Sequence, residues 1–485
     1  MSAASGPQPA HAAPAQPVAD VAVIGAGVVG SAIARELAGY ELSVTLLEAR
    51  ADVGDGTSKA NTAILHTGFD AKPGTLESRL VRAGYHLLSD YASQAGIPVE
   101  RTGALLVAWA PDELAELPVL KAKAAANGYD RCEVVDAAEV YRQIPDLGEG
   151  ALGGLTVPDE SITCTWTTSL ALATDARLRG ADLRLAHRVK SVSHDGGVTT
   201  LRCDAGDVPA RWVVNAAGLG CDLIDQMFGY DRFHVTPRRG ELLVFDKLAR
   251  PLVNKIVLPV PTARGKGVLI SPTIYGNIML GPTAEDLEDR TATGTSEAGY
   301  EFLLGKGRRL MPRLLEEEVT ASYAGLRAAV DAGDYLIEAD GEKRYVLVGG
   351  IRSTGLTSAM AIAEHVRDLL SDAGLKLTPR SDVPSPPRMP NIGEAFPRPY
   401  ADEARIASDP AYGRIVCFCE RVTAGEIRDA CGSPIPPADL GGLRRRTRAM
   451  NGRCQGFFCA AEAGALFEQY RPAAHATSGQ QEVPG

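Results

Sequence analysis

The chain has 485 residues, 45% of them hydrophobic and 23% charged, and is therefore long enough for two or three globular domains. A net charge of -10 at pH 7 leaves no general electrostatic footprint for nucleic acid or for an anionic membrane surface. No apolar run of about eighteen residues occurs, so no transmembrane helix is predicted.

The N-terminal residues 1–19, "MSAASGPQPAHAAPAQPVA", have neither the basic start nor the apolar core of a signal peptide. Their composition predicts a disordered tail. We therefore expect a cytoplasmic protein, whose nine cysteines are reduced or bind metal rather than form disulfides.

A βαβ unit follows the tail. An apolar strand at residues 21–24 leads into a G-x-G-x-x-G motif (Gly25, Gly27 and Gly30), a helical segment, and a second strand at 44–47 that ends on Glu48. Such glycines allow a tight turn and close approach of a pyrophosphate to a helix N-terminus, and the acid can accept hydrogen bonds from a ribose. The unit predicts a dinucleotide site.

The rest of the chain favours FAD over NAD as that dinucleotide. A second G-x-G-x-x-G motif, common where bound NAD and flavin exchange hydride, does not occur. Instead, "RWVVNAAGLG" (211–220) and "YVLVGGIRSTGLTSAMAIAEHVRDLL" (345–370) are strands that end in loops of small residues. A helix starting at Gly355–Thr357 would point its positive end at the flavin carbonyl edge. Taken singly, each is also compatible with an ordinary strand-to-helix connection.

Several further segments carry a family resemblance. With the glycine motif, "TSKANTAILHTGF" (57–69), "NAAG" (215–218), "GKGVLISP" (265–272), "YAGLRA" (323–328) and "GIRSTGLT" (350–357) resemble the D-amino-acid-oxidase-like flavoprotein superfamily. Within it, the chain is most similar to flavin-dependent glycerol-3-phosphate dehydrogenases and oxidases and to L-2-hydroxyglutarate dehydrogenases. The resemblance covers about residues 20–375.

This resemblance implies an α/β fold. A discontinuous Rossmann-type FAD-binding domain (about 20–95, 150–228 and 325–375) would combine with an antiparallel, β-rich substrate domain, mainly 96–149 and 229–324. The segment 77–94 is expected to be helical and 103–109 a strand. The residues expected to bind FAD are Gly25, Gly27, Gly30, Glu48, Thr57, Ser58, Asn61, Ala217, Gly218, Gly350, Ser353, Gly355, Leu356 and Thr357.

Three side chains are candidates for chemistry at the flavin. His66 lies in a loop that resembles the family's H-x-G loop near the isoalloxazine, and an imidazole can take a hydroxyl proton near neutral pH. Lys266 resembles a lysine near the flavin of glycerol-3-phosphate oxidases. Arg327 resembles the arginine that holds an acidic substrate group, although Ala328 stands where many relatives have proline. The non-catalytic alternatives are that His66 only hydrogen-bonds to loop backbone and that Lys266 is a solvated surface lysine.

Further arginines could also bind an anion, and each of them could equally be a surface or structural residue. They are Arg238, Arg239 and Arg352. Because these cations suit phosphate and carboxylate alike, the substrate stays open between a polyol phosphate and a hydroxy acid.

Residues 376–412 are rich in proline and lack helical or strand periodicity, which predicts a tether. It leads to a domain at 413–470, followed by a second disordered tail at 471–485. In this domain Cys417 and Cys419 form a C-x-C pair, and Cys454 and Cys459 form a C-x4-C pair. Four thiolates at this spacing suit zinc or an iron–sulfur cluster.

The segments "CERVTAGEI" and "RRRTRAMNGRCQGFFC" resemble the [2Fe-2S] domain of bacterioferritin-associated ferredoxin, as appended to anaerobic glycerol-3-phosphate dehydrogenases. The resemblance makes a small helical [2Fe-2S] domain the preferred prediction over zinc. Cys431 matches no ligand position and is expected to be a free buried thiol, as are the scattered cysteines Cys132, Cys164, Cys203 and Cys221.

Two local features complete this domain. Thr423 and Glu426 have capping-box spacing, which predicts a helix directly after the first cysteine pair. The arginines at 444, 445, 446, 448 and 453 would offset cluster charge, dock an acidic electron-transfer partner, or form a solvated helix face.

The sequence therefore predicts an FAD-dependent dehydrogenase that oxidises a small anionic secondary alcohol, with sn-glycerol 3-phosphate as the first candidate. A [2Fe-2S] centre would pass electrons singly to a quinone or protein acceptor, and peripheral membrane association would be through a partner. The alternatives are an L-2-hydroxyglutarate or other hydroxy or amino acid dehydrogenase, and a non-catalytic flavin and cluster relay.

Overall fold

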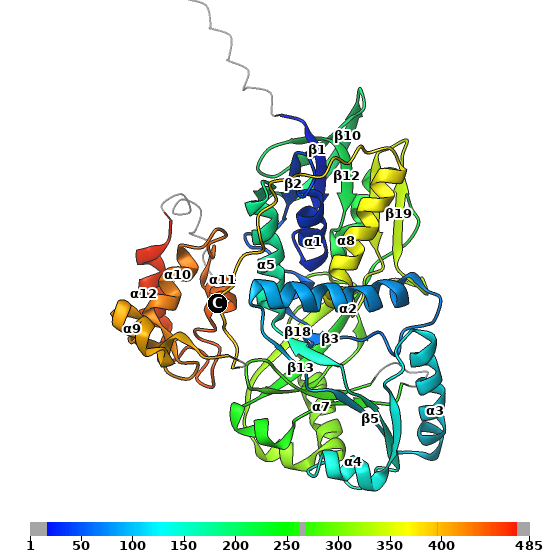
Figure 1. The fold of residues 1–485 in the computed structure, drawn as a ribbon, viewed down its shortest axis with the longest axis vertical. Coiled ribbons are helices and arrows are strands. Elements are labelled where there is room, and N and C mark those ends of the chain that lie inside the picture. The colour runs from blue at the N-terminus through cyan, green and yellow to red at the C-terminus, as the bar shows by residue number, and fades with distance from the viewer. Residues whose placement is uncertain (1–16, 262–266, 395, 473–485) are drawn as a thin grey trace, which may run out of the picture.

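The computed structural model describes residues 17–261, 267–394 and 396–472. Two parts stacked along the long axis form the main body, and a smaller helical domain from the C-terminal region lies against one side (Figure 1). Helix α2 (Leu76–Ala95) lies along the boundary between the two parts. The predicted α/β fold is confirmed.

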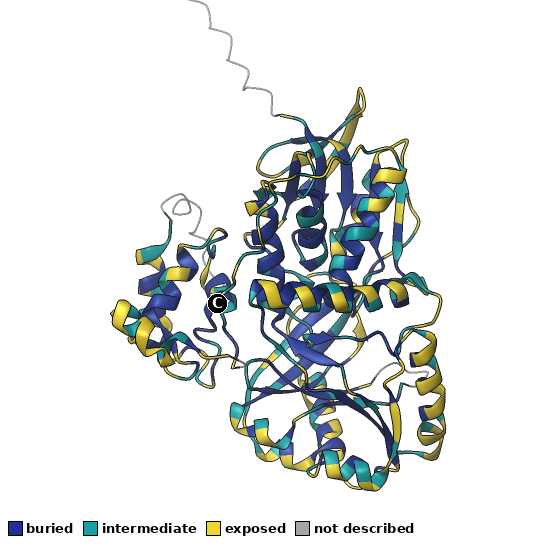
Figure 2. Cartoon of the chain, in the orientation of Figure 1, coloured by how far each residue is buried: buried dark blue, intermediate teal, exposed yellow. Residues whose placement is uncertain are grey.

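A mostly parallel sheet forms the upper part of the body in Figure 1. Its parallel strands lie side by side in the order β9-β2-β1-β12-β20, and β19 and the hairpin β10-β11 add antiparallel strands. The strands are β1 (Ala19–Ile24), β2 (Val44–Leu47), β9 (Asp182–Arg184), β10 (Val189–Asp195), β11 (Val198–Cys203), β12 (Val208–Asn215), β19 (Leu336–Asp340) and β20 (Tyr345–Gly349). The central strands are almost wholly buried, as in parallel sheets covered by helices (Figure 2).

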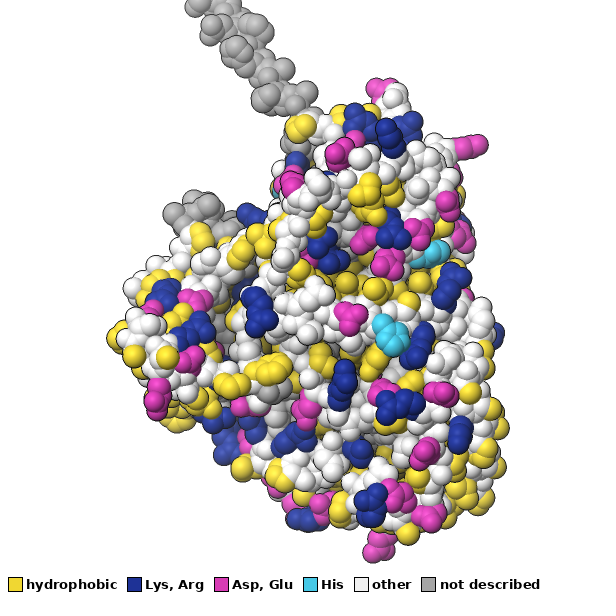
Figure 3. Space-filling view, in the orientation of Figure 1, with side chains coloured by type: hydrophobic (Ala, Val, Ile, Leu, Met, Phe, Trp, Pro, Cys, Tyr) yellow, Lys and Arg dark blue, Asp and Glu magenta, His cyan; other side chains and the backbone are white. Residues whose placement is uncertain are grey.

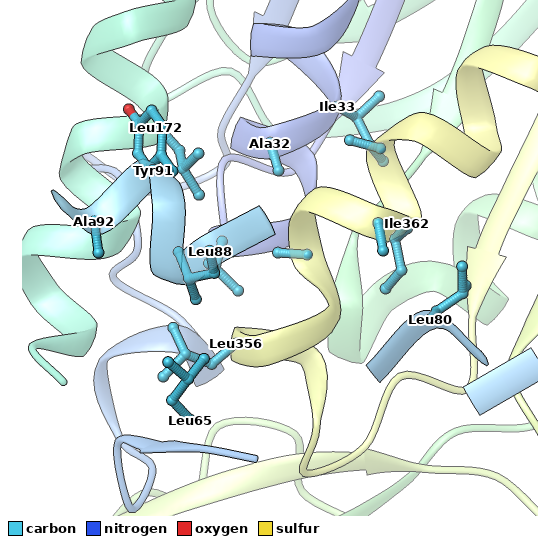
Figure 4. Close-up of a cluster of buried hydrophobic side chains, with 14 of the residues drawn as sticks. Ala32, Ile33, Leu65, Leu80, Leu88, Tyr91, Ala92, Leu172, Leu356 and Ile362 are labelled. Atoms are coloured by element: carbon cyan, nitrogen blue, oxygen red, sulfur yellow. The ribbon is translucent and has the colours of Figure 1, made fainter. Parts of the chain in front are cut away.

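The helices of this part pack into one apolar core. They are α1 (Val28–Leu37), α5 (Thr165–Leu178), α6 (Cys221–Met227) and α8 (Gly355–Asp372), joined by α2. Figure 4 shows Ile33, Leu88, Leu172 and Ile362, from α1, α2, α5 and α8, in this core. A Cβ on Gly84 of α2 would lie 2.3 Å from the carbonyl oxygen of Thr357, so this glycine lets α2 pass close to the start of α8.

The lower part is a second sheet, antiparallel except for the parallel pair β5–β14. Its strand order is β17-β13-β16-β15-β14-β5-β7-β6, and β18 pairs with β13. The strands are β5 (Ala104–Ala108), β6 (Glu133–Asp136), β7 (Gly153–Val157), β13 (Thr236–Phe245), β14 (Ile256–Pro259), β15 (Leu269–Pro272), β16 (Ile278–Gly281), β17 (Glu285–Asp286) and β18 (Val319–Ala329). Helices α3 (Pro111–Ala126), α4 (Ala137–Gln143) and α7 (Glu297–Leu310) lie around it (Figure 1).

The two parts are joined by a small sheet in the order β3-β8-β4, with β3 (Ile64–Leu65), β8 (Ser161–Thr163) and β4 (Val99–Glu100). Strand β18 crosses the boundary expected at residue 325, because it pairs with β13 from Phe245↔Val319 to Thr236↔Ala329. Basic and acidic side chains are interspersed over the face shown in Figure 3. None of the described helices has the length and apolarity that crossing a bilayer requires.

The C-terminal domain contains α9 (Glu403–Ser408), β21 (Ile415–Cys417), β22 (Val422–Thr423), α10 (Ala424–Cys431), α11 (Leu440–Thr447) and α12 (Ala460–Tyr470). The predicted capping box is confirmed. The Thr423 hydroxyl accepts the N–H of Glu426, and the Glu426 carboxylate accepts the N–H of Thr423 at 2.8 Å. The expected tails lie mostly outside the described residues, but Ala19 already belongs to β1.

The proline-rich segment differs from the free tether expected from its sequence. Its backbone is fastened to the body, because Thr378 accepts the N–H of Glu41 at 2.8 Å and Met389 donates its N–H to Ala95 at 2.7 Å. Ile392 is only 2% exposed. Lack of periodicity correctly indicated irregular structure up to residue 398, but it missed α9 and the helical turns at 399–401 and 410–412, and it carried no information about this packing.

Candidate active site and cluster site

The glycine motif forms a turn that only glycine can occupy at two positions. Gly25 has φ 102°, and a Cβ there would lie 2.5 Å from the carbonyl oxygen of Ala216. A Cβ on Gly30 would lie 1.8 Å from the carbonyl oxygen of Gly25. The backbone of the "NAAG" loop therefore lies directly against the motif, with Ala217 and Gly218 following Ala216.

Two helix N-termini open toward this region. Gly27 is the N-cap of α1 and Thr354 that of α8; neither N-cap makes a side-chain capping bond within the described structure, and neither first turn carries an acid. The Ser58 hydroxyl accepts the N–H of Val28 at 2.9 Å, which holds the turn Thr57–Lys59 (η1) beside the start of α1. Uncapped helix N-termini of this kind suit the pyrophosphate and the flavin carbonyl edge, so the residues fit FAD.

Glu48 lies where the motif predicted it, at the end of β2. Its carboxylate accepts the N–H groups of Ala26 and Arg50, both at 2.9 Å. Burial raises the pKa of Glu48, although these two hydrogen bonds oppose the rise. Each oxygen retains acceptor capacity for a ribose hydroxyl.

The segment around Asn61 is held between the two parts of the body. Thr165 of α5 donates its hydroxyl to Ser58 O at 2.8 Å and accepts from the Asn61 amide at 2.9 Å. From β18, Leu326 O accepts the Thr57 hydroxyl at 2.8 Å. The loop expected to bind FAD thus connects to β18, the strand that carries Arg327.

His66 follows β3 and contacts the start of α8. Its N–H donates to the Thr357 hydroxyl at 3.0 Å. Its Nδ1 lies 3.0 Å from Oε2 of Glu160, whose side chain has no exposed surface. The other oxygen of Glu160 accepts the N–H of Thr67 at 2.6 Å and its hydroxyl at 2.9 Å. A carboxylate in this position fixes both the ring orientation and the tautomer of His66.

The four candidate arginines differ in their partners. Arg238 forms an ion pair with Asp286, Arg239 with Glu285, and Arg352 with Glu77. Arg327 has no carboxylate within 4 Å among the described residues and donates only to Thr283 O, at 2.8 Å. Burial lowers the pKa of Arg327, and the nearby Arg238 lowers it further. Asp286 opposes this lowering from beyond 4 Å and is itself paired with Arg238, so Arg327 is a half-buried cation with no close ion pair among the described residues.

The remaining predicted residues are found as follows. Gly350, with φ 68°, and the exposed Ser353 lie in the loop between β20 and α8, which begins at Gly355 and continues with the buried Leu356. Lys266 lies outside the described residues.

The cysteine ligand candidates form two close pairs. Cys419 lies close enough to Cys454 for the two thiols to interact, and Cys417 lies close enough to Cys459. A Cβ on Gly452 would lie 2.2 Å from that of Cys419, so glycine allows the two ligand loops to meet. Among the described residues, no three His, Cys, Asp or Glu side chains are placed to hold one metal ion. Two pairs of thiols fit two bridged irons better than one tetrahedral zinc.

The local charges also fit a cluster. Backbone N–H groups of Phe458, Gly456 and Phe457 lower the pKa of Cys454, so its thiolate is stabilised. Burial raises the pKa of Cys459 to about 12, and the nearby Cys417 contributes. Cys431 is buried in α10, and burial raises its pKa to about 11, as expected for an inert thiol.

Sequence reasoning missed Glu160, because nothing in the turn "VPDES" distinguishes it from a surface acid. It also missed Asp52, which is 2% exposed and bonded by Arg445 and Arg446 of α11, each at 2.7 Å. Of the five arginines in this part of the sequence, four form ion pairs inside the chain: Arg445, Arg446, Arg448 and Arg453.

The fold, the glycine-motif turn that suits FAD and the paired cysteines together define the class of protein. Residues 20–369 match the family described as FAD dependent oxidoreductase, and residues 415–469 match the BFD-like [2Fe-2S] binding domain. The chain belongs to the FAD-dependent oxidoreductase family, and its cofactors are FAD and a [2Fe-2S] cluster.

Known proteins of this family resemble the chain at several levels. A glycerol 3-phosphate dehydrogenase of Caloramator mitchellensis is 35% identical over 444 residues, covering 91% of this chain and 92% of the relative. The FAD-bound structure of L-alpha-glycerophosphate oxidase from Mycoplasma pneumoniae has a TM-score of 0.73 at 28% identity, covering 78% of this chain and 100% of that one. A mitochondrial L-2-hydroxyglutarate dehydrogenase of Arabidopsis thaliana is 28% identical, covering 72% of this chain and 82% of the relative.

Proposed function

We propose that the protein is a dehydrogenase that oxidises sn-glycerol 3-phosphate to dihydroxyacetone phosphate and passes the electrons through its cluster to an external acceptor. The observation that carries the proposal is Arg327, the candidate anion-binding arginine without a carboxylate partner in the described structure. The 35% identity to a glycerol 3-phosphate dehydrogenase over 91% of the chain supports a phosphate ester as the anion.

In this proposal, Arg327 holds the substrate anion. Its Nη2 lies over Gly240 of β13, where a Cβ would be only 2.5 Å away. The guanidinium can therefore lie flat against this strand and offer two donors to one phosphate. Lys266, which precedes β15 in the sequence, would supply a second cation.

In this proposal, His66 takes the proton of the substrate hydroxyl. We assign a proton to Nδ1, because the carboxylate of Glu160 can only accept a hydrogen bond from it. Nε2 then carries the free lone pair, and Glu160 stabilises the imidazolium that forms when Nε2 takes the proton. Bound FAD supplies the acceptor for the hydride that leaves the same substrate carbon.

The surface at the cysteine pairs supports an external acceptor, either a protein or a quinone. Phe418, Phe457 and Phe458 lie between the ligand cysteines in sequence and are 73%, 84% and 79% exposed. Large apolar side chains exposed together mark interaction sites. We further propose a cytoplasmic location, with any membrane contact made through this acceptor.

The test is anaerobic bleaching of the bound flavin by a panel of donors. We expect glycerol 3-phosphate to bleach it and unphosphorylated glycerol not to. Bleaching by L-2-hydroxyglutarate alone would refute the phosphate proposal and select the second candidate, which the similarity to L-2-hydroxyglutarate dehydrogenases favours. If no small donor bleaches the flavin and a partner protein does, the chain is a relay.

The role of Arg327 is tested in the same assay. Replacing it by Met should lower kcat/KM for flavin reduction by about a hundredfold, the value of a charge-assisted contact of about 3 kcal/mol. Arg238→Met is the matched control, because Arg238 is already paired with Asp286 and lies opposite Arg327 in β13. Equal losses in both variants would contradict the assignment.

A further inference from the structure

Arg448 connects the cluster domain to the FAD-binding body. It ends α11 in the left-handed conformation, with φ 69°, and its side chain is only 6% exposed. Its Nε donates to Glu420 at 2.7 Å, and Glu420 directly follows the ligand candidate Cys419. Its guanidinium lies 4.0 Å from the ring centroid of Tyr275, a residue of the body. Through Glu420, Arg448 therefore lies beside the proposed cluster ligands.

The contact continues from Tyr275 to the loop expected to bind FAD. The rings of Tyr275 and Trp166 are stacked, with centroids 5.2 Å apart and an interplanar angle of 27°. The indole N–H of Trp166 donates to Lys59 O at 3.0 Å, and Lys59 is the last residue of η1. The Tyr275 hydroxyl lies 3.0 Å from Sγ of Cys164, at the start of α5. The other end therefore reaches the Thr57–Lys59 turn.

The cluster domain is fixed in this position by a buried ion-pair group. Arg446 bonds both oxygens of Asp52 at 2.7 Å, and Arg445 bonds Asp52 and Asp55 at 2.7 and 2.8 Å. Asp52 lies in the loop that leads into η1. A small cavity between the two domains is lined by Lys59 and Trp166 as well as by Arg445 and Arg446. The stack therefore lies at the centre of a packed interface.

We propose that the stack of Trp166, Tyr275 and Arg448 is the contact through which electrons pass from reduced flavin to the cluster. The proposal rests on the proposed function. The step would move one electron from bound reduced flavin to the oxidised cluster, with no proton or group transferred along the stack. The three side chains stay in their own oxidation states, and they provide a continuous packed medium between the segments that hold the two cofactors.

The alternative role for the stack is purely structural, and the two roles predict different effects of substitution. A structural stack would be needed for docking and cofactor retention, and any side chain that preserves these would restore function. An electron-transfer contact would also depend on the aromatic character of positions 166 and 275 when docking is intact. The order Trp, Phe, Leu at position 166 should then give successively slower transfer.

The experiment uses the full-length protein loaded with FAD and iron, in wild type, Trp166→Leu, Trp166→Phe, Tyr275→Leu and Tyr275→Phe. Trp109→Phe, directly after β5 of the second sheet, is the matched control. Flavin is reduced anaerobically in two ways, by glycerol 3-phosphate and by light with EDTA, which acts on the flavin without substrate. Rapid freezing and EPR follow the mixed-valent cluster, and absorbance follows the flavin. The reduction potentials of both cofactors and resistance of the linker to protease are measured in parallel.

We expect cluster reduction to slow by about tenfold in Trp166→Leu and Tyr275→Leu, within the range for single substitutions along a packed contact network. Flavin bleaching, potentials and protease resistance should stay as in wild type. Wild-type cluster reduction in the loaded Leu variants would overturn the proposal. The Phe variants decide the question if the Leu variants lose iron or docking. Cluster reduction at the wild-type rate in both loaded Phe variants would then overturn the proposal, and slower cluster reduction in Trp166→Phe would support it. If light bleaches the flavin and glycerol 3-phosphate does not, the proposed substrate is refuted. Photoreduction then still tests electron transfer through the stack.

Discussion

Glu160→Gln should inactivate His66 without disturbing the fold. In the wild type, one oxygen of Glu160 accepts both bonds from Thr67 and the other faces Nδ1 of His66. A glutamine has one acceptor oxygen, and the Thr67 N–H at 2.6 Å requires it, so the amide NH2 must face His66. The imidazole would then have to accept at Nδ1 and carry its proton on Nε2. That tautomer cannot take a proton from the substrate.

The expected loss is the contribution of a general base, about 10²- to 10⁴-fold in the rate of flavin reduction. Stopped-flow bleaching under anaerobic conditions measures this rate, and ¹⁵N NMR of the imidazole reports the tautomer directly. The matched control is Asp159→Asn at the neighbouring position, where the carboxylate contacts Tyr129 at 2.9 Å and Arg131 instead of His66. A Glu160→Gln enzyme that binds FAD and bleaches at the wild-type rate would refute both the tautomer assignment and His66 as the base.

Three further outcomes follow from the structure. Asp52→Asn leaves the buried Arg446 without a counter-ion, while Arg445 keeps Asp55, and should lower the free energy of unfolding by about 3–5 kcal/mol, against about 0–1 kcal/mol for Asp204→Asn at an exposed pair; urea unfolding measures both. Burial alone would raise the pKa of Asp52, but Arg446 and Arg445 hold this pKa below its usual value. The ion pairs of Asp52 therefore stabilise the protein fully above about pH 4, and this stabilisation is lost as pH falls through the folded-state pKa. Protease resistance of the linker should be constant from about pH 5 to 8 and fall in acid. Gly30→Ala should abolish FAD binding, seen as loss of flavin absorbance, while Gly56→Ala should retain it because a Cβ there meets nothing within 4 Å.

Local pattern predicted the elements of the fold well. The helix expected at 77–94 is α2 at Leu76–Ala95, and the strand expected at 44–47 is β2 with the same bounds. Both follow from periodicity and from glycine positions, which are properties of short segments. The place of β18 could not be found in this way, because its partner β13 lies more than seventy residues earlier in the chain. Pairing over that distance is decided by packing and not by local sequence.

The residues of the candidate site also fall into two groups, those that local sequence reveals and those that only the fold reveals. Motifs named the residues around Gly25, His66 and the cysteine pairs because each motif is contiguous. Glu160 is separated from His66 by 94 residues, and its function depends on complete burial beside an imidazole. The sequence preferred Arg327 for the anion only through a family resemblance and kept three other arginines as further candidates. Only the positions of Asp286, Glu285 and Glu77 show that these three are already paired.

The fastened linker changes how the two cofactors can communicate. On a free tether of this length, the cluster domain would meet the FAD domain at an effective concentration in the millimolar range and would be shared between flavin and acceptor. Here the linker backbone is bonded to the body, and Asp52 is bonded to two arginines of α11. This packing favours a fixed arrangement of the two sites, and we expect the acceptor to come to the cluster. Phe418, Phe457 and Phe458 are exposed beside the ligand cysteines, so electron exit should depend on this apolar surface and not on movement of the domain.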